Sequence, residues 1–533
     1  MVEIIVDRER AVHEKRRWVR LTRTCNNHCL FCLDAEIVGE KIRPGAEIRA
    51  DIDQGRKDGC QRLILSGGEP TLHPAYLDLV AYGAGQGYAW VQTVTNGRMF
   101  SYRSFAARAV RAGLCEATFS MHGHEAKLHD RLVGVEGAFE QALRGMGNLR
   151  ELGIVVNVDV VLTDLNTPRL PDIIDFFLRF GVREFDLLWM VPFGSAWRNR
   201  DELFPDLERA LPRLHEAIRL ALEAGAVVWT NRLPPPLLEG HEDLIQDPHK
   251  LHDEVRGRLP EYKELISSGE PLRCNQQERC RQCPMEGFCR ALDGLVREIA
   301  TGGPAALAVE AGREIAPGMS NLLARASRLR IHARDRERLV EFVGSLERDG
   351  QSLELVLDFV PADDDLGFVE GLGERVVRLA SGVPAVLEAI LAGWKGEVEV
   401  ELNRATANWL TERMDFIRSQ TDRLQFSAEP MASIINPVEA LKPLARCGTR
   451  LLNLPACFLE GAVSVTEMVP VNIEAAMGAT AGDLVAFTDH YIRHGHRTWS
   501  LKCGSCPWRG SCPGLPVNLV RAHGFASLYH LPA

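Results

Sequence analysis

Three cysteines near the start of the chain have a spacing suited to metal chemistry. Cys25, Cys29 and Cys32 stand in the pattern Cys-x3-Cys-x2-Cys. Three thiolates can bind three irons of a [4Fe–4S] cluster and leave the fourth iron open, much as a catalytic zinc keeps an open position. Ferredoxin-type sites use four cysteines, and no fourth cysteine stands nearby in the sequence. A zinc site that recruits His28 is the alternative for the same residues.

A glycine-rich turn follows the next predicted strand. Residues 63–74 read LILSGGEPTLHP, a buried strand that ends in Gly67-Gly68-Glu69-Pro70 before a helix begins. Glycines let the backbone approach a ligand closely, and the Glu69 carboxylate can accept a hydrogen bond from an ammonium group. A tight strand-to-helix turn without a ligand would also explain the two glycines.

Together these two motifs resemble the radical S-adenosylmethionine (SAM) superfamily. Its hallmark is this cysteine spacing with an aromatic residue before the third cysteine, and Phe31 fits. In the family the cysteines hold a [4Fe–4S] cluster and the glycine loop binds the methionyl amine of SAM, which chelates the open iron. The resemblance implies reductive cleavage of SAM to a 5′-deoxyadenosyl radical that abstracts hydrogen from a substrate. It also implies a reductant protein of the flavodoxin or ferredoxin type.

Further positions match the family pattern along the chain. Thr95, Asn96 and Gly97 close the third predicted strand, where family members place a loop near adenine and ribose. Ser120 ends the fourth strand, at a position that often contacts SAM in the family. For the histidines that follow we expect loop hydrogen bonding in preference to catalysis. The residues that match a common subgroup pattern there are His122, His129, Asp130 and Gly134.

A second cysteine set follows the first alternating region. Four thiolates within one short segment are enough to saturate a [4Fe–4S] cluster, and a four-cysteine zinc site is the rival interpretation. Its position after the barrel is similar to that of the auxiliary clusters in radical SAM enzymes with SPASM or twitch extensions, without the full pattern of those extensions. The four residues are Cys274, Cys280, Cys283 and Cys289.

A third cysteine set repeats the second near the end of the chain. Residues 280–292 and 503–515 share the pattern Cys-x2-Cys-Pro-x2-Gly-x-Cys, which suggests that the C-terminal half is a diverged copy of the first. Cys503, Cys506 and Cys512 need a fourth ligand, for which we choose Cys457, with Cys447 as the alternative. For the nearby histidines His490, His494 and His496 we expect a solvated or capping role in preference to a metal site.

The elements that must position these motifs alternate between strand and helix. Between residues 18 and 230 short β-rich runs alternate with amphipathic segments, which predicts a parallel sheet with right-handed crossovers. The predicted fold class is α/β: a partial (β/α)6 radical SAM barrel, then cysteine-rich auxiliary-cluster segments and a second α/β region. The predicted domains are 1–235, 236–295 and 296–533, with a Gly-, Ala- and Pro-rich linker at 292–325.

Composition limits the partners and the compartment. The chain has 533 residues and a formal net charge of −10, so no broad basic surface for nucleic acid is expected. No apolar run approaches the length of a membrane span, and the N-terminus shows no signal peptide. Without an export signal, the 14 cysteines indicate metal or catalytic use in a reducing cytoplasm.

The leading interpretation is a radical SAM enzyme that matures a ribosomal peptide or protein substrate, because auxiliary-cluster members of the family often modify peptides. A radical SAM enzyme of small-molecule or cofactor biosynthesis is the alternative. A non-catalytic iron–sulfur electron carrier is the alternative from a different functional class, and it predicts no need for a SAM pocket.

Overall fold

The computed structural model describes residues 16–35, 42–302, 306–313, 317–346, 351–428, 436–459 and 462–525. The prediction that no signal peptide is present rests on residues 1–21, of which 1–15 lie outside the described residues. None of the helices in the described ranges has both the length and the apolar character that crossing a bilayer requires.

The N-terminal half forms a curled parallel sheet. Its described residues contribute seven strands that lie in sequential order, each paired in parallel with the next. The predicted partial barrel is therefore confirmed, and a seventh strand extends the six predicted units. The strands are β1 (Arg16–Thr22), β2 (Arg62–Gly67), β3 (Trp90–Thr95), β4 (Glu116–Ser120), β5 (Val155–Leu162), β6 (Glu184–Trp189) and β7 (Val227–Asn231).

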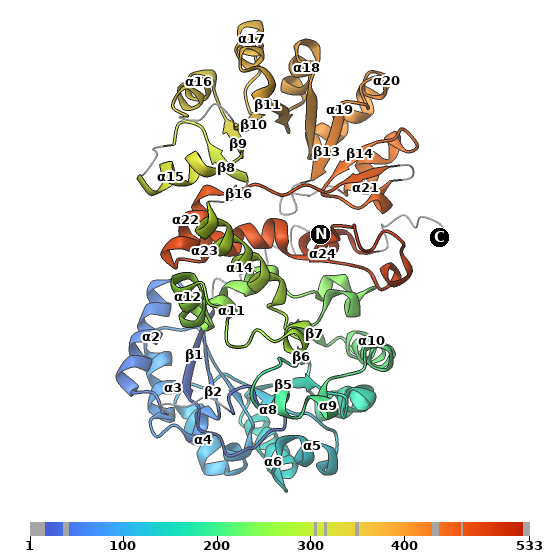
Figure 1. The fold of residues 1–533 in the computed structure, drawn as a ribbon. Helices are drawn as coiled ribbons and strands as arrows, with labels where there is room; N and C mark the ends of the chain where they lie inside the picture. Colours follow the sequence, from blue (N-terminus) through green and yellow to red (C-terminus); the bar gives the residue numbers. More distant parts are fainter. Residues whose placement is uncertain are drawn as a thin grey trace.

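Helices cover the outer face of this sheet (Figure 1). Along β6, Phe185, Leu187 and Trp189 are buried, whereas the alternate residues are less buried and point to the inner face. One face of each strand thus packs on helices and the other faces the lumen. The main covering helices are α2 (Gly45–Lys57), α3 (Tyr76–Gly85), α4 (Arg103–Arg111), α5 (Ala126–Val133), α6 (Ala138–Glu151), α7 (Leu170–Phe180) and α10 (Leu207–Glu223).

The C-terminal half forms a second parallel sheet. Its described part supplies nine strands in the order β15-β14-β13-β12-β11-β10-β9-β8-β16. The predicted second α/β region is therefore confirmed. The strands are β8 (Ala306–Glu310), β9 (Arg328–Ala333), β10 (Ser352–Leu357), β11 (Val376–Ser381), β12 (Glu397–Leu402), β13 (Leu424–Ala428), β14 (Arg450–Leu452), β15 (Val463–Val465) and β16 (Val471–Asn472).

Helices also cover the outer face of the second sheet, at the top of Figure 1. The helices of this half that lie between Pro317 and Leu441 are α15 (Pro317–Arg325), α16 (Arg336–Gly344), α17 (Asp363–Gly371), α18 (Pro384–Gly393), α19 (Arg404–Glu412), α20 (Met414–Arg418) and α21 (Pro437–Leu441).

The predicted linker at 292–325 is wrong. A helix, α14 (Glu286–Thr301), runs into this range, followed by β8 and by α15. β8 pairs with β9 on one side and with β16 on the other. The small residues of β8 indicated a loose segment, but Ala306, Leu307 and Val309 are buried in the second sheet. The predicted boundary between residues 295 and 296 also falls inside α14.

A layer of short helices lies between the two sheets (Figure 1). Segments far apart in the sequence meet there, because Phe288 of α14 stacks edge-on with Tyr262 and with Tyr491. Other helices after the first sheet are α11 (Leu251–Gly257), α12 (Leu259–Ser268), α13 (Gln277–Arg281), α22 (Ile473–Ala481), α23 (Val485–His490) and α24 (Val517–His523), with a two-stranded sheet of β17 (Arg497–Thr498) and β18 (Leu515–Pro516). The short helices α8 (Gly194–Arg198) and α9 (Arg200–Leu203) lie beside the first sheet (Figure 1).

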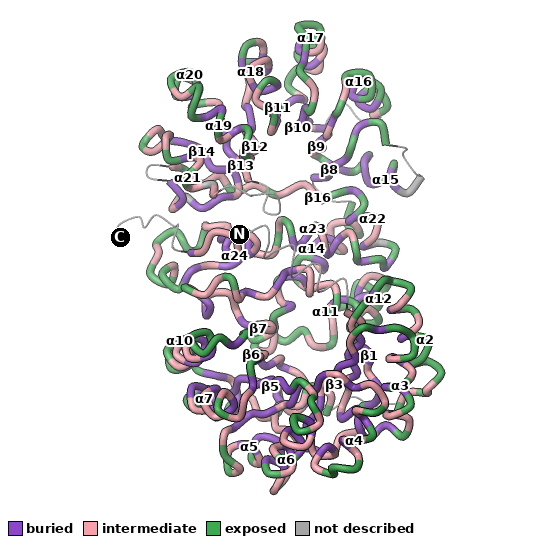
Figure 2. Tube along the Cα trace, turned by 180° about the vertical axis from the view of Figure 1, so that it is seen from behind, coloured by how far each residue is buried: buried purple, intermediate pink, exposed green. Residues whose placement is uncertain are grey.

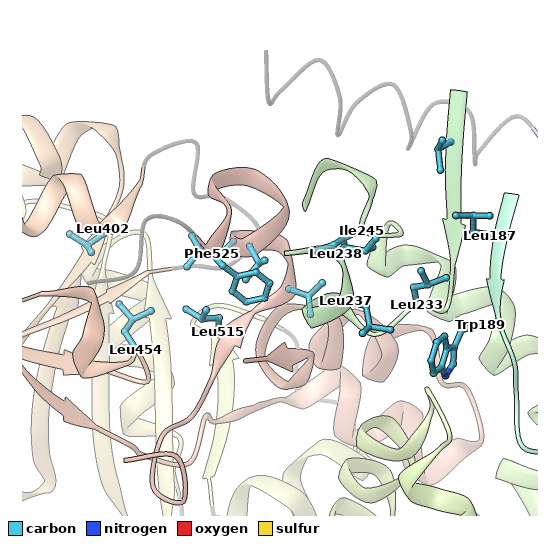
Figure 3. Packing of buried hydrophobic residues seen from close by; sticks show 14 of the residues in the cluster. Leu187, Trp189, Leu233, Leu237, Leu238, Ile245, Leu402, Leu454, Leu515 and Phe525 are labelled. Carbon is cyan, nitrogen blue, oxygen red and sulfur yellow. The ribbon is translucent and has the colours of Figure 1, made fainter. Parts of the chain in front are cut away.

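One hydrophobic cluster runs through both halves. It joins Trp189 of the first sheet to Leu402 of the second by way of Leu237, Leu515 and Phe525, as Figure 3 shows. In Figure 2 the strands are mostly buried, and exposed segments lie on the outer helices. The C-terminal segment therefore holds the two sheets together through shared apolar burial.

Candidate active site

The loop after β1 brings the first three cysteines together. Burial raises the pKa of the Cys29 thiol, and the neighbouring thiols Cys25 and Cys32 raise it further. Cys25 accepts hydrogen bonds from the backbone N–H of Asn27 at 3.4 Å and from Asn96 Nδ2 at 3.8 Å. Such N–H groups stabilise sulfur that carries negative charge. Three soft donors on one loop, with N–H donors at Cys25, fit a cluster with one open iron.

A single metal ion would require a different geometry. Within the described ranges, no group of three or more His, Cys, Asp or Glu residues is arranged to hold one ion. In a cubane each cysteine binds a different iron, so the cysteine sulfurs do not converge on one point. Iron and zinc analysis of the purified protein distinguishes the two interpretations.

The glycine loop is hydrogen-bonded directly to the cysteine loop. Gly68 N donates to Thr22 O at 2.7 Å, and Glu69 N donates to Thr24 O at 2.8 Å. Gly67 has a φ of +145°, and a Cβ on it would lie 2.3 Å from Thr22 O. The two glycines are thus needed for the approach of one loop to the other, in addition to any approach to a ligand.

The Glu69 carboxylate is buried between two loops. Within the described residues, Oε1 accepts from Thr71 N at 3.1 Å, Thr71 Oγ1 at 2.5 Å and Thr95 Oγ1 at 2.8 Å. Oε2 accepts from Asn96 N at 2.7 Å. Burial raises the pKa of Glu69, and these hydrogen bonds oppose that rise. Glu69 joins the loops after β2 and β3, and Oε2 keeps capacity for one further donor.

The loop after β3 also supports the cysteine loop. Asn96 Nδ2 donates to Asn26 Oδ1 at 2.7 Å, and Arg98 donates to the carbonyl of Asn26. Gly97 has a φ of +77°, and a Cβ there would overlap the Phe119 ring. Of the predicted residues, Asn96 therefore lies beside Cys25, and Thr95 contacts Glu69 of the glycine loop. Gly97 follows on the same loop, and Pro70 follows Glu69; their contact with a cofactor stays a prediction.

Ser120, the last residue of β4, lies beside a buried acid within β5. Ser120 Oγ donates to Asp159 Oδ2 at 3.1 Å. Burial raises the pKa of Asp159 to about 7, and the charge of Asp186 on β6 adds to the rise. Asp186 Oδ1 is buried and has no hydrogen-bond partner among the described residues. The inner face of the first sheet therefore carries two acids that sequence reasoning missed. The alternation of apolar and polar residues along β5 and β6 could have predicted that Asp159 and Asp186 face the inner side of the sheet.

The subgroup histidines hydrogen-bond the backbone. His122 Nδ1 accepts from Val161 N at 3.2 Å, and His129 Nδ1 accepts from His122 N at 3.2 Å. Burial lowers the pKa of His129 to about 4 and that of His122 as well, so both rings are neutral. The preference for loop hydrogen bonding is confirmed. Phe31 packs edge-on against His122 with ring centroids 4.7 Å apart.

The segment that carries the cysteine loop and the glycine loop is similar to known proteins. A family model described as "Radical SAM superfamily" matches residues 19–177, which include the cysteine loop, the glycine loop and Ser120. Residues 19–177 form a radical SAM domain. Membership of this superfamily implies a [4Fe–4S] cluster and SAM as cofactors.

Curated relatives of the radical SAM domain carry several different names. An AdoMet-dependent heme synthase of Nitratidesulfovibrio vulgaris is 32% identical over 192 residues, 35% of this chain and 51% of the relative. A PqqA peptide cyclase of Rhodopseudomonas palustris is 29% identical over 36% of this chain and 50% of the relative. A probable GTP 3′,8-cyclase of Sulfurisphaera tokodaii is 29% identical over 36% and 60%. The chain spans about half the length of the curated relatives it matches.

Solved structures show a limited likeness. Streptococcus suis SuiB bound to S-adenosylmethionine is 16% identical, with a TM-score of 0.36 over 43% of this chain and 52% of that chain. Native anSMEcpe with bound AdoMet is 14% identical, with a TM-score of 0.33 over 40% and 64%.

The second cysteine set lies beyond the radical SAM domain and lines a cavity of about 590 Å³. All four of its cysteines, Cys274, Cys280, Cys283 and Cys289, border this cavity. Burial raises the pKa of Cys283 to about 11, and the charges of Cys289 and Cys274 raise it as well. Four soft donors around one cavity fit an auxiliary cluster.

Two residues that the sequence did not single out contact these sulfurs. Arg258 Nη2 donates to Cys274 Sγ at 3.0 Å, and the Tyr262 hydroxyl lies 3.4 Å from Cys289 Sγ. Arg258 also stacks over the ring of Phe193, which follows β6 of the first sheet, at 4.9 Å. Arg258 therefore links the cavity of the second set to the loop that follows β6 of the first sheet.

The third cysteine set gathers its fourth member from a distant loop. Burial raises the pKa of Cys457 to about 12, and the charges of Cys512, Cys503 and Cys506 raise it further. Cys447 instead donates its S–H to Ala445 O at 3.5 Å. The structure thus brings Cys457 into the group, and its ligand role stays a prediction. Nearby, burial lowers the pKa of Arg497 to about 10, while the charge of Cys512 opposes the shift.

Proposed function

We propose that this chain is a radical SAM enzyme whose [4Fe–4S] cluster is held by Cys25, Cys29 and Cys32. When bound, the reduced cluster and SAM supply methionine and a 5′-deoxyadenosyl radical, which abstracts hydrogen from a substrate. The chain holds the cofactors in position and excludes water, since the difficult chemistry belongs to the cofactor.

One observation carries this proposal: the glycine loop and the cysteine loop form a single hydrogen-bonded unit through Gly68, Glu69 and their partners Thr22 and Thr24. This union supports a ligand that would lie at the open iron and against the glycine loop together. An electron carrier needs no such second loop. The amine of SAM would meet Glu69 and the carbonyls of this loop, with Asn96 beside Cys25.

Ser120 and the loop of Thr95, Asn96 and Gly97 would contact the rest of SAM. Ser120 is positioned by Asp159, which accepts its hydroxyl hydrogen. With the Ser120 hydroxyl committed as a donor, its oxygen remains available as an acceptor for a ribose hydroxyl.

We further propose two auxiliary [4Fe–4S] clusters of SPASM or twitch type. One is held by Cys274, Cys280, Cys283 and Cys289, around the cavity that these residues share. The other is held by Cys457, Cys503, Cys506 and Cys512, whose mutual approach supports it. The three-part division of the chain is kept as part of this proposal, with the second boundary moved to the end of α14.

A peptide or protein is the proposed substrate, and a flavodoxin- or ferredoxin-type protein is the proposed reductant. The relative named PqqA peptide cyclase supports the peptide, whereas relatives named heme synthase and GTP cyclase support small-molecule biosynthesis as the alternative. The net charge of −10 gives no support to a nucleic-acid substrate.

The test is anaerobic incubation of the iron-reconstituted protein with SAM and dithionite. Release of 5′-deoxyadenosine, lost in Cys29→Ala, supports the enzyme. The matched control is Cys60→Ala, because Cys60 is a buried thiol that donates to Arg16 O and lies outside all three cysteine sets. Intact SAM with a fully loaded cluster would instead identify an electron carrier.

A further inference from the structure

The inner face of the second sheet is charged, unlike the interior of a purely structural barrel. Along β9, Leu329, Ile331 and Ala333 are buried under helices, whereas Arg328, Arg330 and His332 point to the opposite face. Barrel interiors that serve only as cores are filled by branched apolar side chains. A cavity of about 520 Å³ lies on this face of the second sheet. Its size is that of a small-molecule site.

A network of ion pairs forms one wall of this cavity. Arg330 contacts Glu399 at 2.7 Å and Glu401 at 2.9 Å, and Arg378 contacts Glu467 at 2.8 Å. Replacing buried pairs of this kind with apolar residues is often neutral or stabilising, so stability alone does not explain them. Their mutual hydrogen bonds hold the polar groups in fixed positions, as a binding wall requires.

The opposite wall is the segment that continues α23. Residues Tyr491–Gly495 form a π-helical turn, a feature frequent at functional sites. His490 and His494 line the cavity, with ring centroids 4.9 Å apart. Neither ring has a hydrogen-bond partner in the described part of the chain. Both rings are partly exposed, so the predicted solvated role stays a prediction. Burial lowers the pKa of His490 to about 4 and that of His494 to about 3. A neutral imidazole offers one N–H donor and one acceptor.

The charges around the cavity balance. Of the described lining residues, six are arginines: Arg328, Arg330, Arg334, Arg378, Arg493 and Arg497. Six are carboxylates: Glu310, Glu354, Asp358, Glu399, Glu401 and Glu467. A lining with no net charge disfavours polyphosphates and polycations, whereas it suits a ligand that carries one charge of each sign. Asp358 is exposed at the edge of this lining, and its charge acts on His332, which also lines the cavity.

We propose that this cavity binds a small organic zwitterion, an amino acid or short peptide, with its ammonium group at Asp358 and its carboxylate at His490 and His494. The site does not depend on the SAM centre. It lies in the C-terminal half, where β8 to β15 are parallel and in sequential order and a cysteine segment follows, as in the N-terminal half. The C-terminal half has no Cys-x3-Cys-x2-Cys loop. In this proposal the second sheet binds the zwitterion, and the SAM-dependent reaction takes place at the first sheet.

Calorimetric titration of the reconstituted full-length protein with triglycine tests this proposal. We expect saturable binding that is at least about tenfold weaker in Asp358→Asn and in His494→Gln. Asp364→Asn, on the first turn of α17 and outside the cavity, is the matched control and should bind like the parent. Thermal unfolding of each variant shows whether it is folded.

Three further probes separate the alternatives. Triglycine blocked at both ends is a neutral peptide. Glucose is a neutral polyol, and inorganic phosphate is an anion. Weak or undetectable binding of all three, beside saturable triglycine binding, supports the proposal. The proposal is overturned if triglycine does not bind, or if the blocked peptide binds equally well. It is also overturned if glucose or phosphate binds instead of triglycine, or if folded Asp358→Asn and His494→Gln both bind triglycine as tightly as Asp364→Asn.

Discussion

The backbone N–H of Asn96 donates to Glu69 Oε2 at 2.7 Å, and the Asn96 side chain donates to the sulfur of Cys25. One asparagine thus joins the glycine loop to a proposed cluster ligand. The loops after β1, β2 and β3 form one hydrogen-bonded unit. A change at Glu69 is therefore expected to reach the cysteines without touching them.

Glu69→Gln should weaken both this unit and the reaction. The glutamine amide has only one acceptor oxygen, and its NH2 group would face N–H or O–H groups that now donate to the carboxylate. Some of these buried donors therefore lose their hydrogen-bond acceptor. We expect a loss of about 1–3 kcal/mol in unfolding free energy and a lower yield of 5′-deoxyadenosine. Glu125→Gln, at an exposed position before α5, is the control. Parental stability in Glu69→Gln would contradict the linking role.

Gly67→Ala should destabilise the protein, and Gly147→Ala should not. A Cβ at Gly67 meets Thr22 O at 2.3 Å, at a φ of +145° that L-residues rarely adopt, so we expect a cost of about 1–3 kcal/mol. Gly147 lies within α6 with nothing within 4 Å of its added Cβ, so alanine there should stabilise by about 1 kcal/mol. Chemical denaturation of both variants measures the difference in sign.

Cys457→Ala should remove iron that Cys447→Ala retains. The protein with three cubanes holds about twelve irons, and loss of one auxiliary cluster leaves about eight. Iron and labile-sulfide analysis of anaerobically reconstituted protein gives the count. Equal loss in Cys447→Ala, or full iron in Cys457→Ala, would refute the proposed ligand set.

Arg258→Met should lower the reduction potential of the cluster beside Cys274. The guanidinium donates to the sulfur at 3.0 Å and stabilises its negative charge, more so in the reduced cluster. Redox titration followed by electron paramagnetic resonance measures the potential. Arg256→Met is the control, since Arg256 is exposed and pairs with Asp253. An unchanged potential in Arg258→Met would show that the contact does not act on the cluster.

Asp159→Asn should stabilise the protein above pH 7 and lose that advantage in acid. Burial raises the pKa of Asp159 from 3.8 to about 7. The folded state therefore binds a proton that the unfolded state has released between these values, and stability falls as pH rises through this window. Above pH 7 the cost reaches up to about 4 kcal/mol, which the neutral amide avoids. Thermal unfolding at pH 5 and pH 8, with the exposed Asp201→Asn as control, tests this. A pH-independent difference would contradict it.

Sequence by itself determined the features whose parts are close along the chain. Cys25, Cys29 and Cys32 stand within one loop and Gly67 within one turn, so local pattern was sufficient to predict that these residues lie together. Strand alternation and β-then-α order likewise predicted both parallel sheets, because crossover handedness leaves few topologies. The segment with β8 was missed because its alanines carry little periodic signal.

Tertiary structure alone decided the features that depend on distant contacts. Cys457 meets Cys512, and Arg258 meets Cys274 and Phe193, through packing between segments that no local spacing records. Alternation along β9 shows that Arg330 and Ile331 point to opposite faces, but it does not say which face is covered. Which face is covered depends on the assembled layers: helices pack on one side of the sheet, and the turn that carries His494 lies over the other. Burial is therefore set by the tertiary structure and not by a single strand.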